Sequence, residues 1–422
     1  MVVSVPYGDA VQKAFIPDSI CVQTVDPPCK PVTVPAEDMI AKALDHPIGT
    51  KCLEDMVNPD QNIVIVVNDH TRPGPNAEIV RALIERLERG GVSDSHIAFL
   101  IATGTHRAST EKELIKILGE NYYRRIRIIM HDCRDKKNLV YLGKTVYDMP
   151  VWVNRAVMES DFVITTGLIA PHHSAGFSGG RKSILPGVAG LETLRQHHSL
   201  PIRPFEPAMG FFEGNPFHIA ALAAAKLVHV RFMINAVQDI HKQNVAFVAG
   251  DIEKAHKAGV EICREISTIQ FDGLGDVVIA SPGGTPRDCN LYQAQKALSV
   301  AETVAKKGDC SMILCARAED GYGEGLFRQW MEEADTPEEV IERYKAEGFN
   351  VGNNKAFMFA RALTKGRVII VSENLKKEDL NHMMLEWAPD LQTAFEMACR
   401  DRMPSKVIVL PRAVNMIPKV IT

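Results

Sequence analysis

The chain has 422 residues, of which 46% are hydrophobic and 24% are charged, and its formal net charge is −4. This length predicts two or three domains, and the near-neutral charge favours neither nucleic acid nor an anionic membrane as a partner. No uninterrupted apolar run approaches the roughly 20 residues of a membrane span, and the N-terminus lacks the pattern of a secretory signal. Nine cysteines without a C-x-x-C pair indicate reduced thiols, so we expect a cytoplasmic protein.

Short apolar runs alternate with polar turns and amphipathic segments in the first half of the chain. Runs typical of strands begin at residues 62, 96, 125 and 161, and segments typical of helices cover 77–91 and 110–120. This alternation predicts a parallel α/β sheet. Because ligands bind beyond the carboxyl ends of such strands, we expect the polar residues that follow these runs to share one site.

The pattern changes after residue 200. Residues 201–217 are rich in proline and aromatic residues and predict a loop or lid. A helix, a pair of strands and a second helix are predicted up to residue 266, and a second α/β pattern begins near residue 273. We therefore predict two α/β domains with mainly parallel sheets and an active site in the cleft between them. Their expected bounds are 1–272 and 273–422, with the last segment able to pack back on the first domain.

Two polar clusters follow the first two predicted strands. The first runs from Asp69 to Arg72, and Arg72 could bind a carboxylate or phosphate through two parallel hydrogen bonds. The alternative is a solvated arginine beside an aspartate that caps the next helix. The second cluster, ATGTHR, ends near His106, whose imidazole suits general acid/base catalysis, although a lone histidine at a strand end is often structural.

The segment HHSAGFSGGRKSILPGVAG (172–190) is too rich in glycine for a helix interior and too polar for a buried strand. Its glycines would let backbone amides approach an anion that Arg181 or Lys182 could neutralise. The spacing matches neither the P-loop nor the dinucleotide fingerprint, so an ordinary nucleotide or NAD site is not indicated. A lysine on such a loop can also be a point of covalent attachment.

Two further clusters contain residues that could hold a metal or a carboxylate. Neutral imidazole, as at His197 or His198, is a common ligand of nickel, zinc or copper, but no zinc motif accompanies this pair. The stretch GGTPRDCNLYQAQKAL (283–298) leads from a glycine turn into a helix. Gln293 and Lys296 share one face near its start, which suits a carboxylate, with a solvated lysine as the alternative.

Taken together, these clusters resemble the lactate racemase family, whose enzymes use a nickel-pincer nucleotide. The motifs that carry the resemblance are DHTRP (69–73), ATGTHR (102–107), PHHSAGFSGGRKSILPGVAG (171–190), the histidine pair at 197 and 198, and GGTPRDCNLYQAQKAL (283–298). The resemblance implies a racemase of a 2-hydroxy acid, with lactate as the first expectation, that moves hydride reversibly from C2 to the cofactor. It also implies partner proteins that synthesise the cofactor and insert its nickel.

The resemblance further implies a role for each matching residue. Lys182 matches the lysine that is tethered to the pyridinium-3-thioamide-5-thiocarboxylic acid mononucleotide. His198 matches the protein ligand of nickel, with His197 as the alternative register. His106 and His172 match the two acid/base histidines. The remaining matches are the substrate-binding Arg72, Tyr292, Gln293 and Lys296 and the cofactor-binding Asp69, Ser178, Gly179 and Gly180.

One segment departs from the family pattern. Where the lactate enzymes place a tryptophan against the substrate, this chain reads NKAFMFAR (354–361), with Phe357 and Phe359 but no tryptophan. This difference keeps open an epimerase or racemase that acts on another 2-hydroxy acid, such as a sugar acid or a malate-like acid. A phosphate-binding α/β enzyme without nickel and a non-catalytic binding protein are the remaining alternatives.

Overall fold

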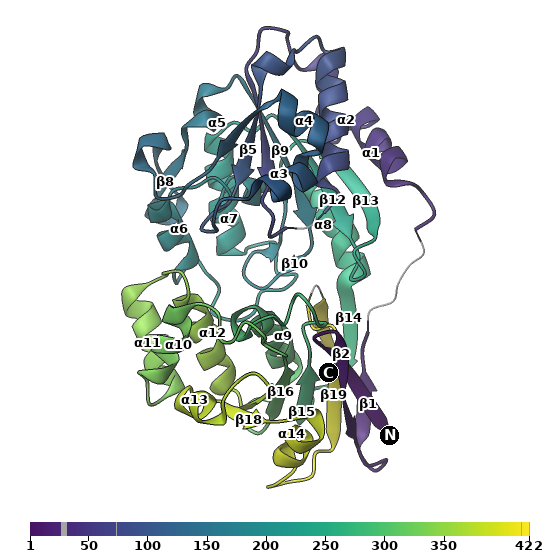
Figure 1. Cartoon of the computed structure of the whole chain (residues 1–422), viewed down its shortest axis with the longest axis vertical. Coiled ribbons are helices and arrows are strands. Elements are labelled where there is room, and N and C mark those ends of the chain that lie inside the picture. The colour runs from purple at the N-terminus through teal and green to yellow at the C-terminus, as the bar shows by residue number, and fades with distance from the viewer. Residues whose placement is uncertain (27–31, 73, 415, 422) are drawn as a thin grey trace. The chain divides into compact units, whose positions relative to one another are not determined.

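The computed structural model describes residues 1–26, 32–72, 74–414 and 416–421. The chain divides into two compact units: unit 1 contains Met1–Pro28 and Ser267–Thr422, and unit 2 contains Cys29–Ile266. Each unit is built around its own six-stranded sheet (Figure 1). The prediction of two α/β domains with mainly parallel sheets is therefore confirmed. No helix in the described residues is long and apolar enough to cross a membrane.

The sheet of unit 2 has the strand order β13-β12-β9-β4-β5-β6. Its strands are β4 (Ile63–Asn68), β5 (Ile97–Ala102), β6 (Arg127–Met130), β9 (Phe162–Ile169), β12 (Phe232–Gln238) and β13 (Asn244–Gly250). All neighbours pair in parallel except β12 and β13, which are antiparallel. The chain adds β5 and β6 on one side of β4 and then returns to β9 on the other. The strand order therefore reverses at β4, which is where open α/β sheets bind their ligands.

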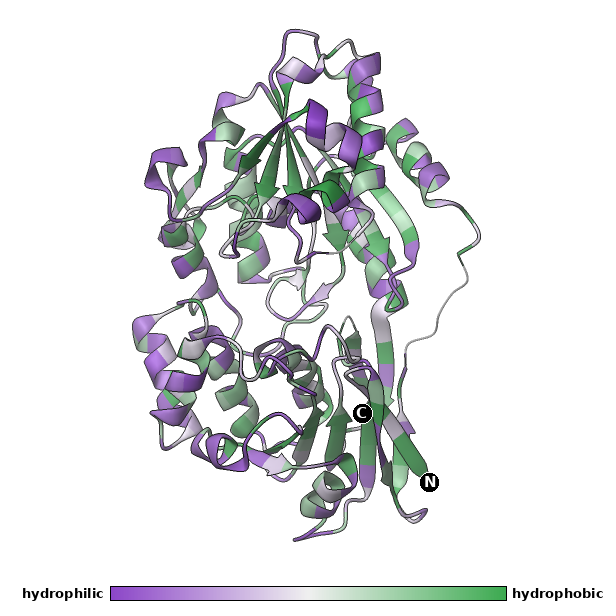
Figure 2. Ribbon diagram, in the orientation of Figure 1, coloured by the Kyte–Doolittle hydropathy of each residue, from purple (hydrophilic) through white to green (hydrophobic). Residues whose placement is uncertain are grey.

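Helices cover the unit 2 sheet because their apolar residues recur every three or four positions. On α2, Ile79, Leu83 and Leu87 belong to the same buried cluster as Ile65 of β4 and Phe99 of β5. Figure 2 shows hydrophobic strands beside helices with mixed faces. The helices of this unit are α1 (Ala36–Asp45), α2 (Asn76–Arg89), α3 (Glu111–Leu118), α4 (Glu120–Arg125), α5 (Arg155–Glu159), α6 (Leu191–His198), α7 (Pro216–Leu227) and α8 (Lys254–Ser267).

Smaller elements complete unit 2. They are the hairpin of β7 (Leu139–Thr145) and β8 (Met149–Asn154), the short pair of β10 (Pro171–His172) and β11 (Gly176–Phe177), and the 3₁₀ turns Leu53–Asp55, Asp94–His96, Lys136–Asn138, Val146–Asp148 and Gly180–Ser183. The predicted loop at 201–217 forms turns up to residue 215. It is fastened to the glycine-rich segment, because Ala208 N–H donates to the His173 carbonyl and Gly210 N–H to the Gly176 carbonyl.

The sheet of unit 1 is parallel throughout, with the order β18-β17-β16-β15-β19-β3. Its strands are β3 (Cys21–Thr24), β15 (Val277–Ala280), β16 (Ser311–Cys315), β17 (Arg367–Val371), β18 (Glu386–Ala388) and β19 (Lys406–Leu410). Strands β15, β16, β17 and β19 are hydrophobic in sequence and lie in the second α/β pattern that the sequence predicted after residue 273. The helices are α9 (Leu291–Val304), α10 (Gly325–Glu332), α11 (Pro337–Glu347), α12 (Asn353–Leu363), α13 (Lys377–His382) and α14 (Leu391–Ala398).

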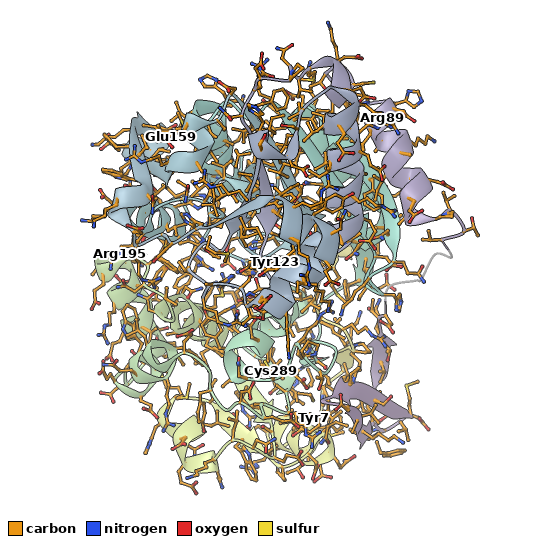
Figure 3. All side chains as sticks on the ribbon, turned by 45° about the horizontal axis from the view of Figure 1, so that its top comes forward. Tyr7, Arg89, Tyr123, Glu159, Arg195 and Cys289 are labelled. Atoms are coloured by element: carbon orange, nitrogen blue, oxygen red, sulfur yellow. The ribbon has the colours of Figure 1, made fainter. Side chains whose placement is uncertain are left out.

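The N-terminal residues lie in unit 1, whereas the sequence led us to expect them in the first domain of residues 1–272. Strand β3 pairs in parallel with β19, and the hairpin of β1 (Val2–Tyr7) and β2 (Ala10–Phe15) buries Val3 and Val5 in the unit 1 core. The Tyr7 hydroxyl, labelled in Figure 3, accepts a hydrogen bond from Glu373 N–H at 2.9 Å. The last strand, β20 (Ile417–Ile421), pairs with β14 (Thr268–Asp272), also within unit 1.

Candidate active site

Three polar segments of unit 2 begin where neighbouring strands end. Asp69 directly follows β4, His106 lies four residues after β5, and His172 lies three residues after β9. Strand β4 pairs with both β5 and β9 in parallel, so these three carboxyl ends share one edge of the sheet. The fold therefore brings together residues that are more than 100 positions apart, as the sequence predicted for this unit.

Asp69 and His106 form a carboxylate–imidazole pair in which the carboxylate is buried and the imidazole is exposed. The Oδ2 atom of Asp69 lies 2.7 Å from His106 Nδ1, and Asp69 is only 2% exposed. Its other oxygen accepts hydrogen bonds from the Thr71 hydroxyl at 2.7 Å and the Thr71 N–H at 3.1 Å. The carboxylate is therefore held from two sides, and it fixes the orientation of the His106 ring.

The charge on Asp69 is maintained despite its burial. Burial alone would raise the pKa of Asp69, but the hydrogen bond and charge of His106, together with the Thr71 hydrogen bond and the charge of Arg72, hold that pKa below its usual value. Arg72 is exposed, and its guanidinium bonds only weakly to Thr71, at 3.3 Å. An exposed guanidinium beside this pair can bind a small carboxylate.

His172 is held by its own loop. Its Nδ1 accepts hydrogen bonds from the backbone N–H groups of Ser174 and Ala175, each at 3.1 Å, and its ring stacks on His173 with centroids 4.5 Å apart. Burial lowers the pKa of His172 well below its usual value, and the nearby charges of Lys182, His173 and Arg72 lower it further. His172 is thus neutral at physiological pH. Arg72 acts electrostatically on both Asp69 and His172, which places the three in one neighbourhood.

The glycines of the 172–190 segment allow close packing within the protein. A Cβ on Gly179 would lie 2.4 Å from Asn235 Oδ1, and a Cβ on Gly180 would lie 2.6 Å from the His256 ring. The Gly180 N–H donates to Asn235 Oδ1 at 2.7 Å, and the Ser178 hydroxyl donates to the Leu168 carbonyl at 2.7 Å. These two groups therefore bond within the protein, so the expected approach of the Gly180 amide to an anion is not what the structure shows.

Arg181 and Lys182 follow these glycines in a 3₁₀ turn. The Arg181 side chain is buried and bonds to the Ala175 carbonyl at 2.9 Å and to His256 Nε2 at 3.0 Å, which are neutral partners. Burial lowers the pKa of Arg181 to about 9. Lys182 is half-buried, and its charge is one cause of the lowered pKa values of His172 and His198. A buried cation with neutral partners beside a lysine creates a positive environment that suits an anionic ligand.

The histidine pair at the end of α6 has unequal surroundings. His197 is fully buried, and its Nε2 lies 2.9 Å from the Phe217 carbonyl. His198 is half-buried, and its Nδ1 lies 3.0 Å from the Leu194 carbonyl, so Nδ1 carries the proton and Nε2 has the lone pair. A carbonyl that orients an imidazole in this way is typical of metal-binding histidines. Both histidines have one ring nitrogen at a backbone carbonyl, and the half-buried His198 is the more accessible of the two.

Sequence reasoning missed several residues that shape this site. Asn235 holds the Gly180 amide, His256 contacts Arg181, and Asn215 donates to the Ser174 carbonyl at 2.9 Å behind His172. All three are buried polar side chains. Asn235 is the one polar residue in the run FMINAV of β12, and that isolated polar residue was the signal in the sequence that could have marked it.

The predicted substrate residues of unit 1 lie together on α9. Lys296 Nζ donates to Gln293 Oε1 at 2.8 Å, so both side chains do share one helical face, and Asn290 caps the helix. Lys355 Nζ lies 5.4 Å from the centre of the Tyr292 ring and donates to Gln295. The segment NKAFMFAR, which departs from the family pattern, lies in α12. Its Phe357 stacks on Tyr344 and its Phe359 on Phe327, and both phenylalanines are fully buried core residues.

Two surface cavities lie away from the candidate site residues. One, of about 570 Å³, opens at the amino ends of β4 and β5, and the other, of about 400 Å³, at the amino ends of β15 and β16. Neither is lined by any of the candidate residues. Among the residues that the structure describes, no group of three or more histidine, cysteine, aspartate or glutamate side chains could hold a metal ion.

The fold and the site define an α/β enzyme that handles protons on an anionic small molecule. A carboxylate-oriented histidine and a second histidine stand beside exposed and buried cations at the carboxyl edge of a parallel sheet. Sequence profiles agree: the Lactate racemase N-terminal domain matches residues 7–210 and the Lactate racemase C-terminal domain matches residues 272–418. The chain belongs to the lactate racemase family, and it is an isomerase of the racemase type.

Individual relatives support this assignment over most of the chain. The lactate racemase of Thermoanaerobacterium thermosaccharolyticum is 34% identical over 92% of this chain and 91% of its own length. The lactate racemase of Lactiplantibacillus plantarum is 35% identical over 91% of each chain. The structure of the Thermoanaerobacterium lactate racemase apoprotein matches with a TM-score of 0.89 at 32% identity, covering 99% of this chain and 100% of that one. A Thermotoga maritima protein that is 19% identical shares the fold, with a TM-score of 0.67 over 92% of this chain and 98% of that one.

Proposed function

We propose that the enzyme interconverts the enantiomers of a 2-hydroxy acid, with lactate as its substrate. The observation that carries this proposal is the pair of histidines, His106 and His172, which follow the two strands on either side of β4, beside Arg72. Inversion of a 2-hydroxy acid needs a proton-handling group for the hydroxyl on each side of the carbon, and one histidine would serve a dehydrogenase. The names and the extent of the relatives support lactate.

The substrate is held by its carboxylate in this proposal. Arg72 suits two parallel hydrogen bonds to a carboxylate, and Gln293 and Lys296 offer an amide and an ammonium on one helical face. Tyr292 is assigned to the wall of the substrate pocket. His106 and His172 exchange the hydroxyl proton while the carboxylate stays fixed, and such positioning contributes several kcal/mol to the lowering of the barrier.

The residues also suit the nickel-pincer nucleotide of this family. Lys182 would carry the covalent tether, and the positive environment of Arg181 and Lys182 suits a nucleotide phosphate. His198 would offer Nε2 to nickel, because its Nδ1 proton is directed at the Leu194 carbonyl. When bound, the cofactor supplies a hydride acceptor for C2. Asp69, Ser178, Gly179 and Gly180 belong to the same proposed site, where the glycines shape the loop around it.

The cofactor requires other proteins in this proposal. The chain would receive its nucleotide and nickel from dedicated synthesis and insertion proteins, and it would work in the cytoplasm, where its cysteines stay reduced. Purified alone, it should therefore be inactive.

The proposal is tested with the chain co-expressed with those synthesis proteins. We expect L-lactate to lose its optical activity, nickel to be present, and an adduct mass to map to Lys182. The variant Lys182→Arg keeps the charge and should lose the adduct, while Lys226→Arg, an exposed lysine on α7, should keep it. If the enzyme acts on another 2-hydroxy acid instead, a panel of larger 2-hydroxy acids assayed for loss of optical activity will identify it. Activity in Lys182→Arg without nickel would refute the proposal.

A further inference from the structure

The sheet of unit 1 has its own point at which the strand order reverses. From β15 the chain extends the sheet through β16, β17 and β18 on one side, and it then returns to add β19 on the other side of β15. Open parallel sheets bind ligands beyond the carboxyl ends of their strands at such a point. The residues that follow β15 and β19 are therefore the part of this unit where a ligand is expected.

Two arginines meet beside a glycine turn at this point. Arg287 follows β15, Arg412 lies two residues after β19, and the two strands pair in parallel. Gly283 adjoins both side chains, because a Cβ on this glycine would lie 3.4 Å from Arg412 Cγ and 3.8 Å from Arg287 Nη1. Its φ of +103° favours glycine. The bare turn thus lets both arginine side chains approach the carboxyl end of β15.

The two guanidinium groups differ in their partners. Arg412 forms an ion pair with Asp26, which lies two residues after β3. The Arg287 guanidinium is half-buried, and it forms no hydrogen bond or ion pair with any residue that the structure describes. Asp288, its neighbour in the chain, is engaged elsewhere, since its Oδ2 accepts the Gly8 N–H at 2.7 Å. Arg287 has therefore lost part of its water without gaining an acceptor for its N–H groups.

The charges around Arg287 favour an anion. Burial lowers the pKa of Arg287 below its usual value, and the charge of Arg412 lowers it further. A bound anion would offset both effects, because it supplies acceptors and an opposite charge. Arg287 and Arg412 are positive and Asp26 is negative, so the three groups together carry one positive charge. That charge matches a carboxylate better than a phosphate group, which is nearly doubly charged at neutral pH.

We propose that Arg287 and Arg412, together with the Gly283 turn, form a binding site for the carboxylate group of a small organic acid. The planar fork of Arg287 holds the two carboxylate oxygens, and Arg412 adds a second positive charge beside them. The site is distinct from Gln293 and Lys296, which the proposed function assigns to the substrate, and it does not depend on that assignment. A carboxylic acid can thus bind unit 1 without occupying the substrate residues.

The direct test uses the full chain without cofactor. Protein with ¹⁵N-labelled arginine is titrated with acetate at constant ionic strength, with chloride as the balancing anion, and the side-chain Nε–H signals are followed. Arg287→Gln and Arg89→Gln assign two of these signals by their absence. We expect the Arg287 signal to shift and saturate, while that of Arg89, an exposed arginine on α2, stays nearly unchanged. A linear Arg287 shift no larger than that of Arg89 overturns the proposal.

Two variants test whether the site has the charges that the structure gives it. Arg287→Gln should weaken acetate binding by about 10-fold or more, followed through the Arg412 signal, because the fork is lost. Asp26→Asn removes the negative charge beside Arg412 and should tighten acetate binding by about 2–5-fold. Arg89→Gln is the matched control and should leave the affinity unchanged. An unchanged affinity in Arg287→Gln would show that Arg287 does not bind the acid.

The class of ligand is tested with inorganic phosphate under the same conditions. The wild type should bind acetate more tightly than phosphate, and Asp26→Asn should move the preference toward phosphate, because two positive charges then remain uncompensated. Tighter binding of phosphate by the wild type would contradict the carboxylate assignment. None of these measurements requires turnover, so a negative result here leaves the proposed racemase function intact, and an inactive loaded enzyme leaves this site intact.

Discussion

Gly179→Ala tests why the 172–190 segment needs its glycines. Gly179 has φ +78° and ψ −177°, a backbone conformation that residues other than glycine rarely adopt. An added Cβ would lie 2.4 Å from Asn235 Oδ1, 2.8 Å from Ile169 Cγ1 and 3.1 Å from the Leu168 carbonyl. Backbone strain costs about 1–3 kcal/mol and overpacking about 1–3 kcal/mol more, so we expect a loss of about 2–6 kcal/mol in unfolding free energy.

The assay combines urea unfolding with hydrogen exchange of the amides in residues 162–184. Protection should fall first in this stretch, because Lys182 N–H donates to the Gly179 carbonyl and the turn depends on it. Gly325→Ala is the matched control, since a Cβ there meets nothing within 4 Å. An unfolding free energy for Gly179→Ala within about 0.5 kcal/mol of wild type, the range of neutral surface changes, would refute the packing argument.

Three further predictions concern stability and specificity. Burial lowers the pKa of His131 to about 4, so protonation below pH 6.5 favours the unfolded chain. Between pH 6.5 and 4, the unfolding free energy of the wild type should therefore fall by about 3 kcal/mol more than that of His131→Gln, as measured by urea unfolding. Asn235→Ala leaves the buried Gly180 N–H without its acceptor and should cost about 1–3 kcal/mol, measured in the same way; an unchanged stability would contradict that bond. Phe359→Trp should cost about 1–3 kcal/mol and leave the preference among 2-hydroxy acids unchanged, because Phe359 is a core residue; a changed preference would place it in the pocket.

The sequence predicted best those features that depend on a single strand or helix. The apolar runs IVIVVN and FVITTGLI predicted strands correctly, and the amphipathic pattern of α2 predicted that helix, because burial on one face or both imposes a period. Gln293 and Lys296 were placed on one helical face by spacing alone, and the structure pairs them at 2.8 Å.

Pairings between distant segments could not be predicted in this way. Strand β3 pairs with β19, almost 400 residues later, and nothing within CVQT indicates that partner. The contact between Asp69 and His106 depends on the adjacency of β4 and β5, which local pattern does not fix. The sequence suggested that Gly179 and Gly180 let the backbone approach an anion, whereas in the structure they accommodate Asn235 and His256, two residues that lie far along the chain.

The central claim is that the histidines move only the hydroxyl proton while the hydrogen on C2 travels as hydride. It is tested most directly by incubating the cofactor-loaded enzyme with L-lactate in D₂O and isolating the D-lactate that forms. If the account is correct, the product retains protium at C2, because that hydrogen never exchanges with solvent. Deuterium at C2 of the D-lactate would show proton abstraction from carbon and would contradict it.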